Sequence, residues 1–227
     1  MAGWGEFTLA MALFAGSHFL PRLGGLRGRM IARLGRGRYF VLYGLVSLAI
    51  LIWLIDAAGR APHVELWPQT AEARWIPSLA MPVALLLAVL GMGIDQPHTP
   101  GARPNASFDA DRPGLAAITR HPLLIALGLW AGAHLAPNGD LAHVILFGGF
   151  AAMSLAAIAL FEARARRREG PAFFDNSAIL SLRPLARRAW WRANGRPLAI
   201  RGALAAVAWL ALLHAHPLLF GVSPMPR

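Results

Sequence analysis

The sequence predicts an all-α, polytopic integral membrane protein, a helical bundle with about six transmembrane helices. Of its 227 residues, 56% are hydrophobic and 15% are charged, and the mean hydropathy is +0.49. A helix needs about 20 mostly apolar residues to cross about 30 Å of hydrocarbon. Because hydrocarbon offers the backbone no hydrogen-bond partner, each apolar segment should be a helix. The qualifying segments are residues 4–20, 40–56, 75–94, 115–136, 141–161 and 197–220.

The distribution of arginine predicts how these helices are oriented. All 22 basic residues are arginine, and the formal net charge is +11. They concentrate in residues 21–39 and 164–196, whereas the loops 57–74 and 137–140 are nearly neutral. Under the positive-inside rule, the arginine-rich stretches stay in the cytoplasm, and both termini lie on the outer side of the membrane, which for a bacterial inner membrane is the periplasmic side. The charge is therefore assigned to topology and to contact with membrane lipids, and not to nucleic-acid binding.

The first two helices are separated by a basic connection. Glu6 precedes the first apolar stretch and no basic residue does, so we interpret this segment as a retained helix and not as a secretion signal. It ends at Pro21, because proline disfavours helix in the residue before it. The connection that follows is expected to contain a short amphipathic helix on the membrane face.

The third helix contains Pro77 and Pro82, which predict a kink unless Pro77 lies in the first turn. Residues 94–113 are rich in turn formers and should be irregular. The turn 137–140, Pro-Asn-Gly-Asp, predicts a tight antiparallel hairpin of the fourth and fifth helices, with Asp140 capping the fifth.

Residues 162–196 are too charged to span and are expected on the inner surface of the membrane. No internal repeat or second domain is visible, so one domain is predicted over residues 1–227.

Histidine is the main candidate ligand, because the chain has no cysteine. Thirteen helical residues separate His121 from His134, a rise of about 20 Å that leaves the two rings near opposite faces. One small site cannot therefore use both. The two histidines define an inner and an outer group of polar side chains.

At the inner end, His121 is expected to share its depth with His18, Arg120 and Glu162. Such ionisable groups at a membrane boundary indicate an active site or a cofactor anchor between the first, fourth and fifth helices. The alternative is that they cap helix ends and form interfacial ion pairs, since Glu162 and Arg166 have the ordinary i, i+4 spacing.

At the outer end, His134 is expected to share its depth with His143, His214 and His216. Imidazole suits iron, zinc and copper, so this group is a candidate metal site. The alternative is a set of ordinary interfacial histidines whose polar edges face water.

The motifs GSHFLPR, RHP and AHL and the NGD turn occur in this order, and together they resemble the NnrU family of bacterial membrane proteins. That family is related to the plant 15-cis-zeta-carotene isomerase. The resemblance implies a membrane protein of redox or nitrogen-oxide (denitrification-linked) metabolism and, as in the isomerase, haem b held by two histidines near a lipophilic substrate. Carried over by motif, the axial ligands of the haem iron are His18 and His134. Membrane depth alone instead favours His18 with His121, so His121 is the alternative ligand. Ala131 stands where the isomerase has a cysteine, which removes any ligand switch through a thiolate.

The RHP motif is also similar to integral membrane methyltransferases of the isoprenylcysteine and methanethiol type. Those enzymes bind S-adenosylmethionine at the cytoplasmic face. The residues that would then contribute to the cofactor site are Arg120, His121, Pro122, Glu162 and Glu169, with Arg183 downstream. Phenylalanines stand at 173 and 174 where tyrosines would be expected. A third hypothesis is a non-catalytic assembly factor for a membrane oxidoreductase, which predicts a copurifying partner and no tightly bound cofactor.

Overall fold

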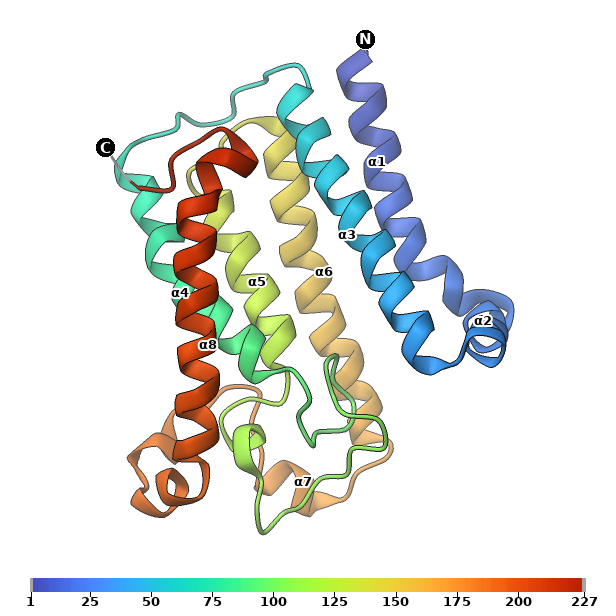
Figure 1. Cartoon of the computed structure of the whole chain (residues 1–227), viewed down its shortest axis with the longest axis vertical. Coiled ribbons are helices and arrows are strands. Elements are labelled where there is room, and N and C mark those ends of the chain that lie inside the picture. Colours follow the sequence, from blue (N-terminus) through green and yellow to red (C-terminus); the bar gives the residue numbers. More distant parts are fainter. Residues whose placement is uncertain (1, 226–227) are drawn as a thin grey trace. The chain divides into compact units, whose positions relative to one another are not determined.

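The structure is a computed structural model that describes residues 2–225 (Figure 1). Within this range the chain is all-helical and has no β-strand, which confirms the predicted class. Its internal contacts divide it into two compact units. Unit 1 comprises Met1–Pro68 and Gly139–Leu146, and unit 2 comprises Gln69–Asn138 and Phe147–Arg227. The single domain expected over the whole chain stays a prediction.

Four helical segments are long and apolar enough to cross a membrane. They are α3 (Arg36–Arg60), η2 with α4 (Glu72–Arg74 and Trp75–Leu90), α6 (Leu141–Arg166) and α8 (Arg188–Phe220). Between 6% and 22% of the residues in their apolar windows are buried, so most of these side chains face outward, as in helices solvated by lipid.

The other two predicted spans correspond to shorter helices, α1 (Ala2–Phe19) and α5 (Pro122–Leu135). The 14 residues of α5 rise about 21 Å, less than the thickness of a hydrocarbon core. The number six is therefore not confirmed, and the placement of both termini outside stays a prediction.

In unit 1, α1 packs against α3. The Glu6 carboxylate accepts hydrogen bonds from Trp53 Nε1 at 3.0 Å and from Arg60 Nη2 at 2.5 Å. Between these helices lie η1 (Leu20–Gly25) and α2 (Leu26–Leu34). No residue of α2 is buried, which agrees with the short surface helix expected in this connection.

The chain returns to unit 1 at the predicted 137–140 turn. Leu66 N donates to Gly139 O at 2.7 Å, and Leu141 N donates to Val64 O at 2.8 Å. A Cβ on Gly139 would lie 2.0 Å from Trp67 O, so only glycine fits here. Asp140 Oδ1 accepts from His143 N at 3.3 Å, which confirms the predicted cap of α6.

In unit 2, α4 packs against both α5 and α8. Pro77 lies in the first turn of α4, where its missing N–H costs nothing, and Pro82 lies inside the helix. Ser78 Oγ donates to Pro224 O at 2.8 Å, which ties the C-terminal segment to the start of α4.

The antiparallel hairpin of α5 and α6 is confirmed within unit 2. The rings of Trp130 and Phe147 lie 5.4 Å apart, and Ser154 Oγ donates to Leu124 O at 2.5 Å. A Cβ on Gly128 would lie 3.1 Å from Ser154 Oγ, so the helices are close at this point. They therefore bring residues before α5 to the end of α6.

Two predicted boundaries were wrong. The helix expected over 115–136 begins at Pro122, after the 3-10 turn η3 (Gly114–Ala117), because a proline disfavours helix in the residue before it. The helix expected from residue 197 begins at Arg188, so part of the segment expected on the inner surface continues into a membrane helix. Only α7 (Pro171–Asp175) and η4 (Arg183–Ala186) lie between α6 and α8.

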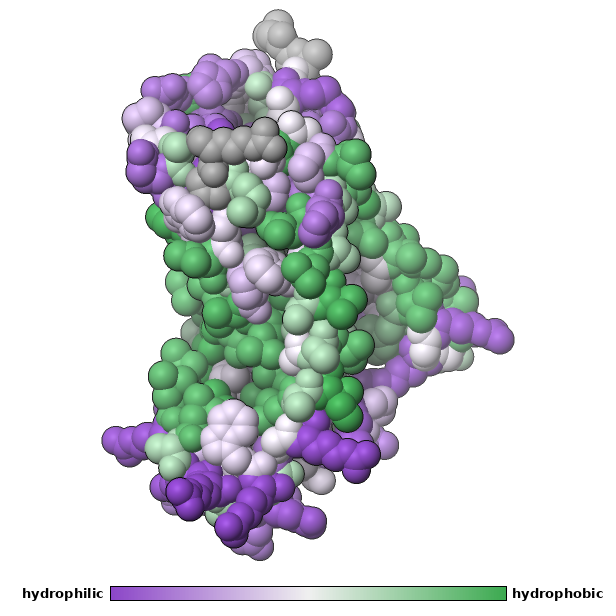
Figure 2. All heavy atoms as spheres, turned by 60° about the vertical axis from the view of Figure 1, so that its left-hand side comes forward, coloured by the Kyte–Doolittle hydropathy of each residue, from purple (hydrophilic) through white to green (hydrophobic). Residues whose placement is uncertain are grey.

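Hydrophobic side chains cover the middle of unit 2 where α4 and α8 face the viewer, and hydrophilic side chains gather at its ends (Figure 2). The exposed arginines of the first turns of α8, including Arg188, Arg192 and Arg196, lie beyond its long apolar stretch. This banding matches a helix bundle that crosses a membrane with its arginines at one boundary.

Candidate functional site

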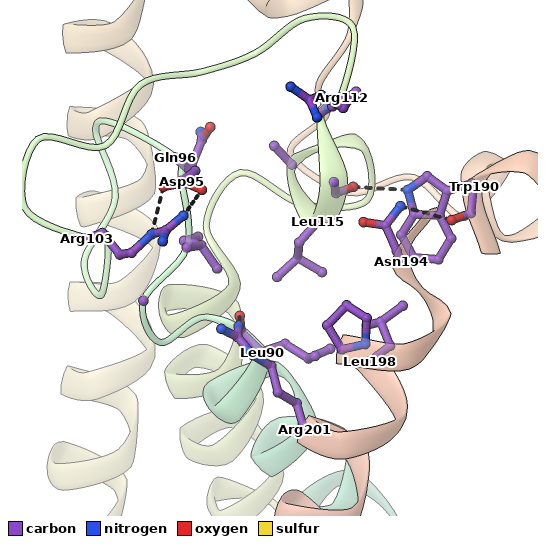
Figure 3. Close-up of a pocket in the computed structure, with 16 residues that line it drawn as sticks. Leu90, Asp95, Gln96, Arg103, Arg112, Leu115, Trp190, Asn194, Leu198 and Arg201 are labelled. Carbon is purple, nitrogen blue, oxygen red and sulfur yellow. Dashed lines mark hydrogen bonds and ion pairs between the residues drawn. The ribbon is translucent and has the colours of Figure 1, made fainter. Parts of the chain in front are cut away.

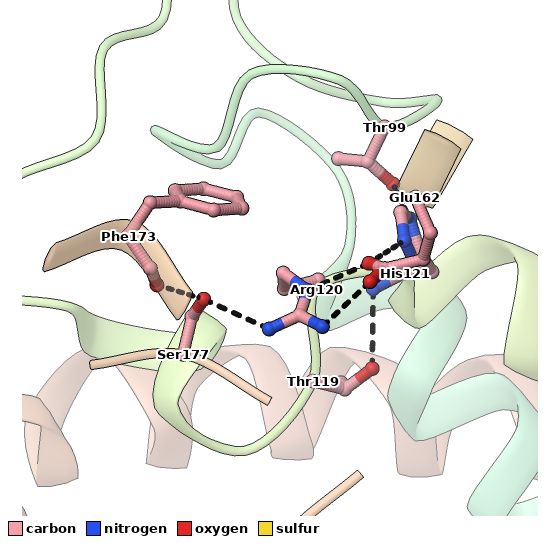
Figure 4. Close-up of polar contacts among 7 residues, drawn as sticks. All are labelled: Thr99, Thr119, Arg120, His121, Glu162, Phe173 and Ser177. Atoms are coloured by element: carbon pink, nitrogen blue, oxygen red, sulfur yellow. Dashed lines mark hydrogen bonds and ion pairs between the residues drawn. The ribbon is translucent and has the colours of Figure 1, made fainter. Parts of the chain in front are cut away.

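Three charged or ionisable residues are buried together in unit 2, with 5% exposure for Arg120, 1% for His121 and 7% for Glu162. Arg120 donates from Nε and Nη2 to the two oxygens of Glu162, both at 2.7 Å. His121 Nε2 lies 2.9 Å from Glu162 Oε1 (Figure 4). We call these three residues the Arg120 cluster.

The backbone before α5 places Arg120 and His121. Arg120 N donates to Ala178 O at 2.7 Å, and Ala178 N donates to Ala116 O at 3.0 Å, so this segment lies along the one that follows α7. His121 adopts φ −129° and ψ 55° directly before Pro122, which begins α5. The chain turns into α5 directly after His121. The side chains of Arg120 and His121 both contact Glu162 on α6.

Residues from two loops complete the cluster. Ser177 Oγ accepts from Arg120 Nη1 at 3.1 Å, and Thr99 Oγ1 lies 3.4 Å from His121 Nδ1. The Arg120 guanidinium also lies 5.7 Å and 5.3 Å from the ring centroids of Phe173 and Phe174, within the range of cation–π attraction. Sequence reasoning missed Thr99 and Ser177, since neither stands in a motif.

The cluster is a closed network, because every nitrogen and oxygen of its three side chains beyond the backbone has a partner. Burial lowers the pKa of His121, a shift that the bond to Glu162 partly offsets. A neutral imidazole that donates to the carboxylate satisfies both groups. The arrangement can pin α5, α6 and α7 together and can hold a proton between His121 and Glu162.

Two expectations about this end need correction. Glu162 pairs with Arg120 and not with Arg166, because the arginine before α5 reaches both carboxylate oxygens. Arg166 lies instead 5.2 Å from the Phe174 ring. From the sequence alone, Asp95 after the third helix is also expected at the depth of His121, but it pairs with Arg103, eight residues further along the same loop.

His98 and Glu169 form a second pair of an imidazole and a carboxylate, which was not predicted from the sequence. His98 Nε2 lies 2.7 Å from Glu169 Oε1, and the two side chains are 14% and 28% exposed. The pair connects the loop before α5 to the chain just after α6. It adds a second, more accessible imidazole and carboxylate to this end of unit 2.

His18 lies near the end of α1 in unit 1. Its Nδ1 lies 2.8 Å from Phe14 O, one helical turn earlier. A carbonyl only accepts, so Nδ1 carries a hydrogen, and the neutral form of the ring then has its lone pair on Nε2. The rings of Phe14 and Tyr43 lie 4.4 Å and 5.8 Å away.

His134 lies near the end of α5 in unit 2 and has the same arrangement. Its Nδ1 lies 2.8 Å from Trp130 O, again one turn earlier. The rings of Trp130 and Phe147 lie 5.7 Å and 5.4 Å from the imidazole. His134 therefore also presents Nε2 from an aromatic surrounding.

The other outer histidines differ in their partners. The Nδ1 of His216 lies 2.8 Å from Val222 O. His143 Nδ1 pairs with Asp140 at 2.6 Å, within unit 1. Between residues 2 and 225, no group of three or more histidines, cysteines and carboxylates could hold a metal ion.

The comparison with family models agrees with the motifs. A model described as NnrU protein matches residues 6–224, nearly the whole chain. The chain belongs to the NnrU family. No curated protein and no solved structure matches it. Family membership by itself assigns no chemistry, which has to be inferred from the residues themselves.

Proposed function

We propose that this NnrU family member binds haem b in the bacterial inner membrane and acts in redox or nitrogen-oxide metabolism. The observation that carries the proposal is the hydrogen bond that His18 and His134 each make through Nδ1. Each ring donates from Nδ1 to a main-chain carbonyl, which leaves Nε2 as the ligand atom. Histidines that bind metals usually make such a bond with the other nitrogen, because it fixes the tautomer and the ring orientation.

The aromatic surroundings of each of these two histidines support the proposal. Both imidazoles stand among aromatic rings, and Phe147 and Phe150 extend the apolar wall beside Trp130. His121 fits less well, since Thr99 and Glu162 engage both of its nitrogens. His18 and His134 are the ligands that the family motifs assign, and His121, which the sequence places at the same membrane depth as His18, is the alternative.

When bound, haem would supply an iron that exchanges one electron and whose potential its histidine ligands set. The chain's own residues would orient the ligands, through Phe14 O and Trp130 O, and would exclude water with their aromatic rings. A lipophilic small molecule is the substrate class that suits this apolar surrounding. Ala131, fully buried one turn before Leu135, offers no thiolate, so a histidine would have to supply any exchangeable ligand.

The test is the visible spectrum of the protein purified in detergent, with haem quantified as the pyridine haemochrome. We expect one haem per chain, and loss of the Soret band in His18→Ala and in His134→Ala. His214→Ala is the matched control, because His214 makes the same Nδ1 bond to the preceding turn but is exposed. Retention of the band in both ligand variants, or its absence from protein made with excess haem, would refute the proposal. Loss of the band in His121→Ala with retention in His134→Ala would reassign the pair to His18 and His121.

A second candidate function is S-adenosylmethionine-dependent methyl transfer at the cytoplasmic face. It is favoured by the convergence of Arg120 and His121 of the RHP motif with Glu162, which lies 41 residues beyond His121 in the sequence (Figure 4). This function predicts saturable binding of S-adenosylmethionine by protein without a Soret band. Glu169→Gln should weaken that binding, whereas the exposed Arg167→Gln should not. A protein that binds neither cofactor but copurifies with a membrane oxidoreductase would fit an assembly factor instead.

A further inference from the structure

A cavity of about 450 Å³ lies in unit 2, between the end of α4, the loop before α5 and the first half of α8 (Figure 3). Leu90, Leu115 and Leu198 line it with apolar surface, and three arginines line it with positive charge. The only acidic residue among its lining residues is Asp95. Neither the Arg120 cluster nor His18 and His134 contribute to it.

The three arginines differ in how far their charge is neutralised. Arg103 donates from Nε to Asp95 at 2.7 Å, and Arg112 pairs with Asp109 at 3.2 Å. Arg201 donates from Nη1 to Leu90 O at 2.8 Å and has no carboxylate partner in the part of the chain that the structure describes. Arg201 is thus the lining arginine whose charge stays uncompensated.

The position of Arg201 makes this charge unusual. It lies 19 residues before Phe220, so the helix beyond it rises about 28 Å, close to one hydrocarbon thickness. Arg201 therefore stands where α8 enters the membrane, half-buried against the carbonyl end of α4. The helix dipole of α4 favours a cation here, but a guanidinium at a membrane boundary is most stable with an anion.

The walls of the cavity suit an amphipathic anion. Trp190 Nε1 donates to Gly114 O at 3.0 Å, which fastens the loop before α5 to the first turns of α8. Figure 3 shows Leu115 and Leu198 directed into the space beside Arg201. A ligand with a phosphate and an apolar part would place its charge on the guanidinium and its carbon chain on the leucines.

We propose that this cavity binds the phosphate of an anionic phospholipid headgroup, with Arg201 as the principal contact. Guanidinium and phosphate match in geometry and charge, and basic pockets at the cytoplasmic ends of membrane helices suit such headgroups. The site is independent of haem. Free phosphate shares the chemistry, so the experiment separates the two sources.

The experiment measures lipid binding to delipidated protein by native mass spectrometry, with dioleoyl phosphatidylglycerol, dioleoyl phosphatidylcholine and inorganic phosphate as probes. We expect phosphatidylglycerol to bind more tightly than phosphatidylcholine, and Arg201→Gln to weaken it about tenfold or more. Arg196→Gln is the matched control, because Arg196 is exposed on the same helix outside the cavity. Leu198→Trp, which fills the cavity and leaves its charges in place, should weaken the binding as well.

Equal binding by Arg201→Gln and Arg196→Gln would overturn the proposal, as would equal affinity for the two lipids. If Arg201→Gln does not fold, unchanged binding by Leu198→Trp has the same consequence. Binding of inorganic phosphate that depends on Arg201, without preference for phosphatidylglycerol, would assign the site to a free phosphate compound and reject the lipid.

Discussion

Replacing Glu162 with methionine tests whether the Arg120 cluster holds unit 2 together. The change leaves a buried guanidinium with one hydroxyl partner, Ser177, and two aromatic neighbours. Breaking a buried ion pair from one side costs about 3–5 kcal/mol, and arginine cannot give up its proton to reduce that cost. We therefore expect Glu162→Met to lower the free energy of unfolding by about 4 kcal/mol.

Arg120→Met should cost less, about 3 kcal/mol, because Glu162 keeps its bond to His121 and can take up a proton. The double variant removes both charges and should cost about 2 kcal/mol or less, since two apolar side chains can pack where the pair stood. The assay is denaturant unfolding in detergent, followed by circular dichroism, with Arg167→Gln as the exposed control. Costs of the single variants that simply add in the double variant would show that the two residues are not coupled, and would refute this reasoning.

Three further predictions concern pH, an unpaired amide and a glycine. The pKa of His121 is lower in the folded protein than the ordinary value of 6.5. As the pH falls, the imidazole is therefore protonated in the unfolded chain before it is protonated in the folded protein, so stability should fall as the pH drops below 6.5. His121→Gln should flatten this dependence in the same unfolding assay run across the pH range. Gln96 is 1% exposed, and neither its amide nitrogen nor its amide oxygen has a hydrogen-bond partner within residues 2–225. Gln96→Met should therefore raise the free energy of unfolding by about 1–3 kcal/mol, and a decrease would mean that the amide has hydrogen-bond partners. Gly139→Ala should destabilise unit 1 by forcing Cβ against Trp67 O, whereas Gly132→Ala, with open space at Cβ inside α5, should gain about 0.5–1 kcal/mol by thermal unfolding.

Features with a local cause were predictable from the sequence. The 137–140 turn, the Asp140 cap and the hairpin of α5 and α6 all follow from residues that act on their immediate neighbours. The apolar segments predicted helices for the same reason. Their ends were less predictable, since Arg188 to Arg196 look like a surface segment and yet continue α8.

The candidate site was predictable from the sequence only in part. Arg120, His121 and Glu162 were expected to gather, because membrane depth and the hairpin bring them to one end. The partner of each was not predictable, since Arg120 reaches Ser177 across 57 residues of sequence and His121 reaches Thr99 across 22. Both partners come from irregular loops, whose paths no periodicity encodes.

The bonds between residues 64–67 and 139–141 also constrain how the chain is made. The earlier segment leaves the ribosome roughly 70 residues before its partner, a delay of about 4–15 seconds at usual rates of synthesis. During that interval its backbone amide groups stay hydrated while residues 69–138, which include α4 and α5, are synthesised. The bonds of residues 64–67 to residues 139–141 therefore form only after residues 69–138 have been synthesised. An arrest of translation before Gly139 would prevent these bonds from forming.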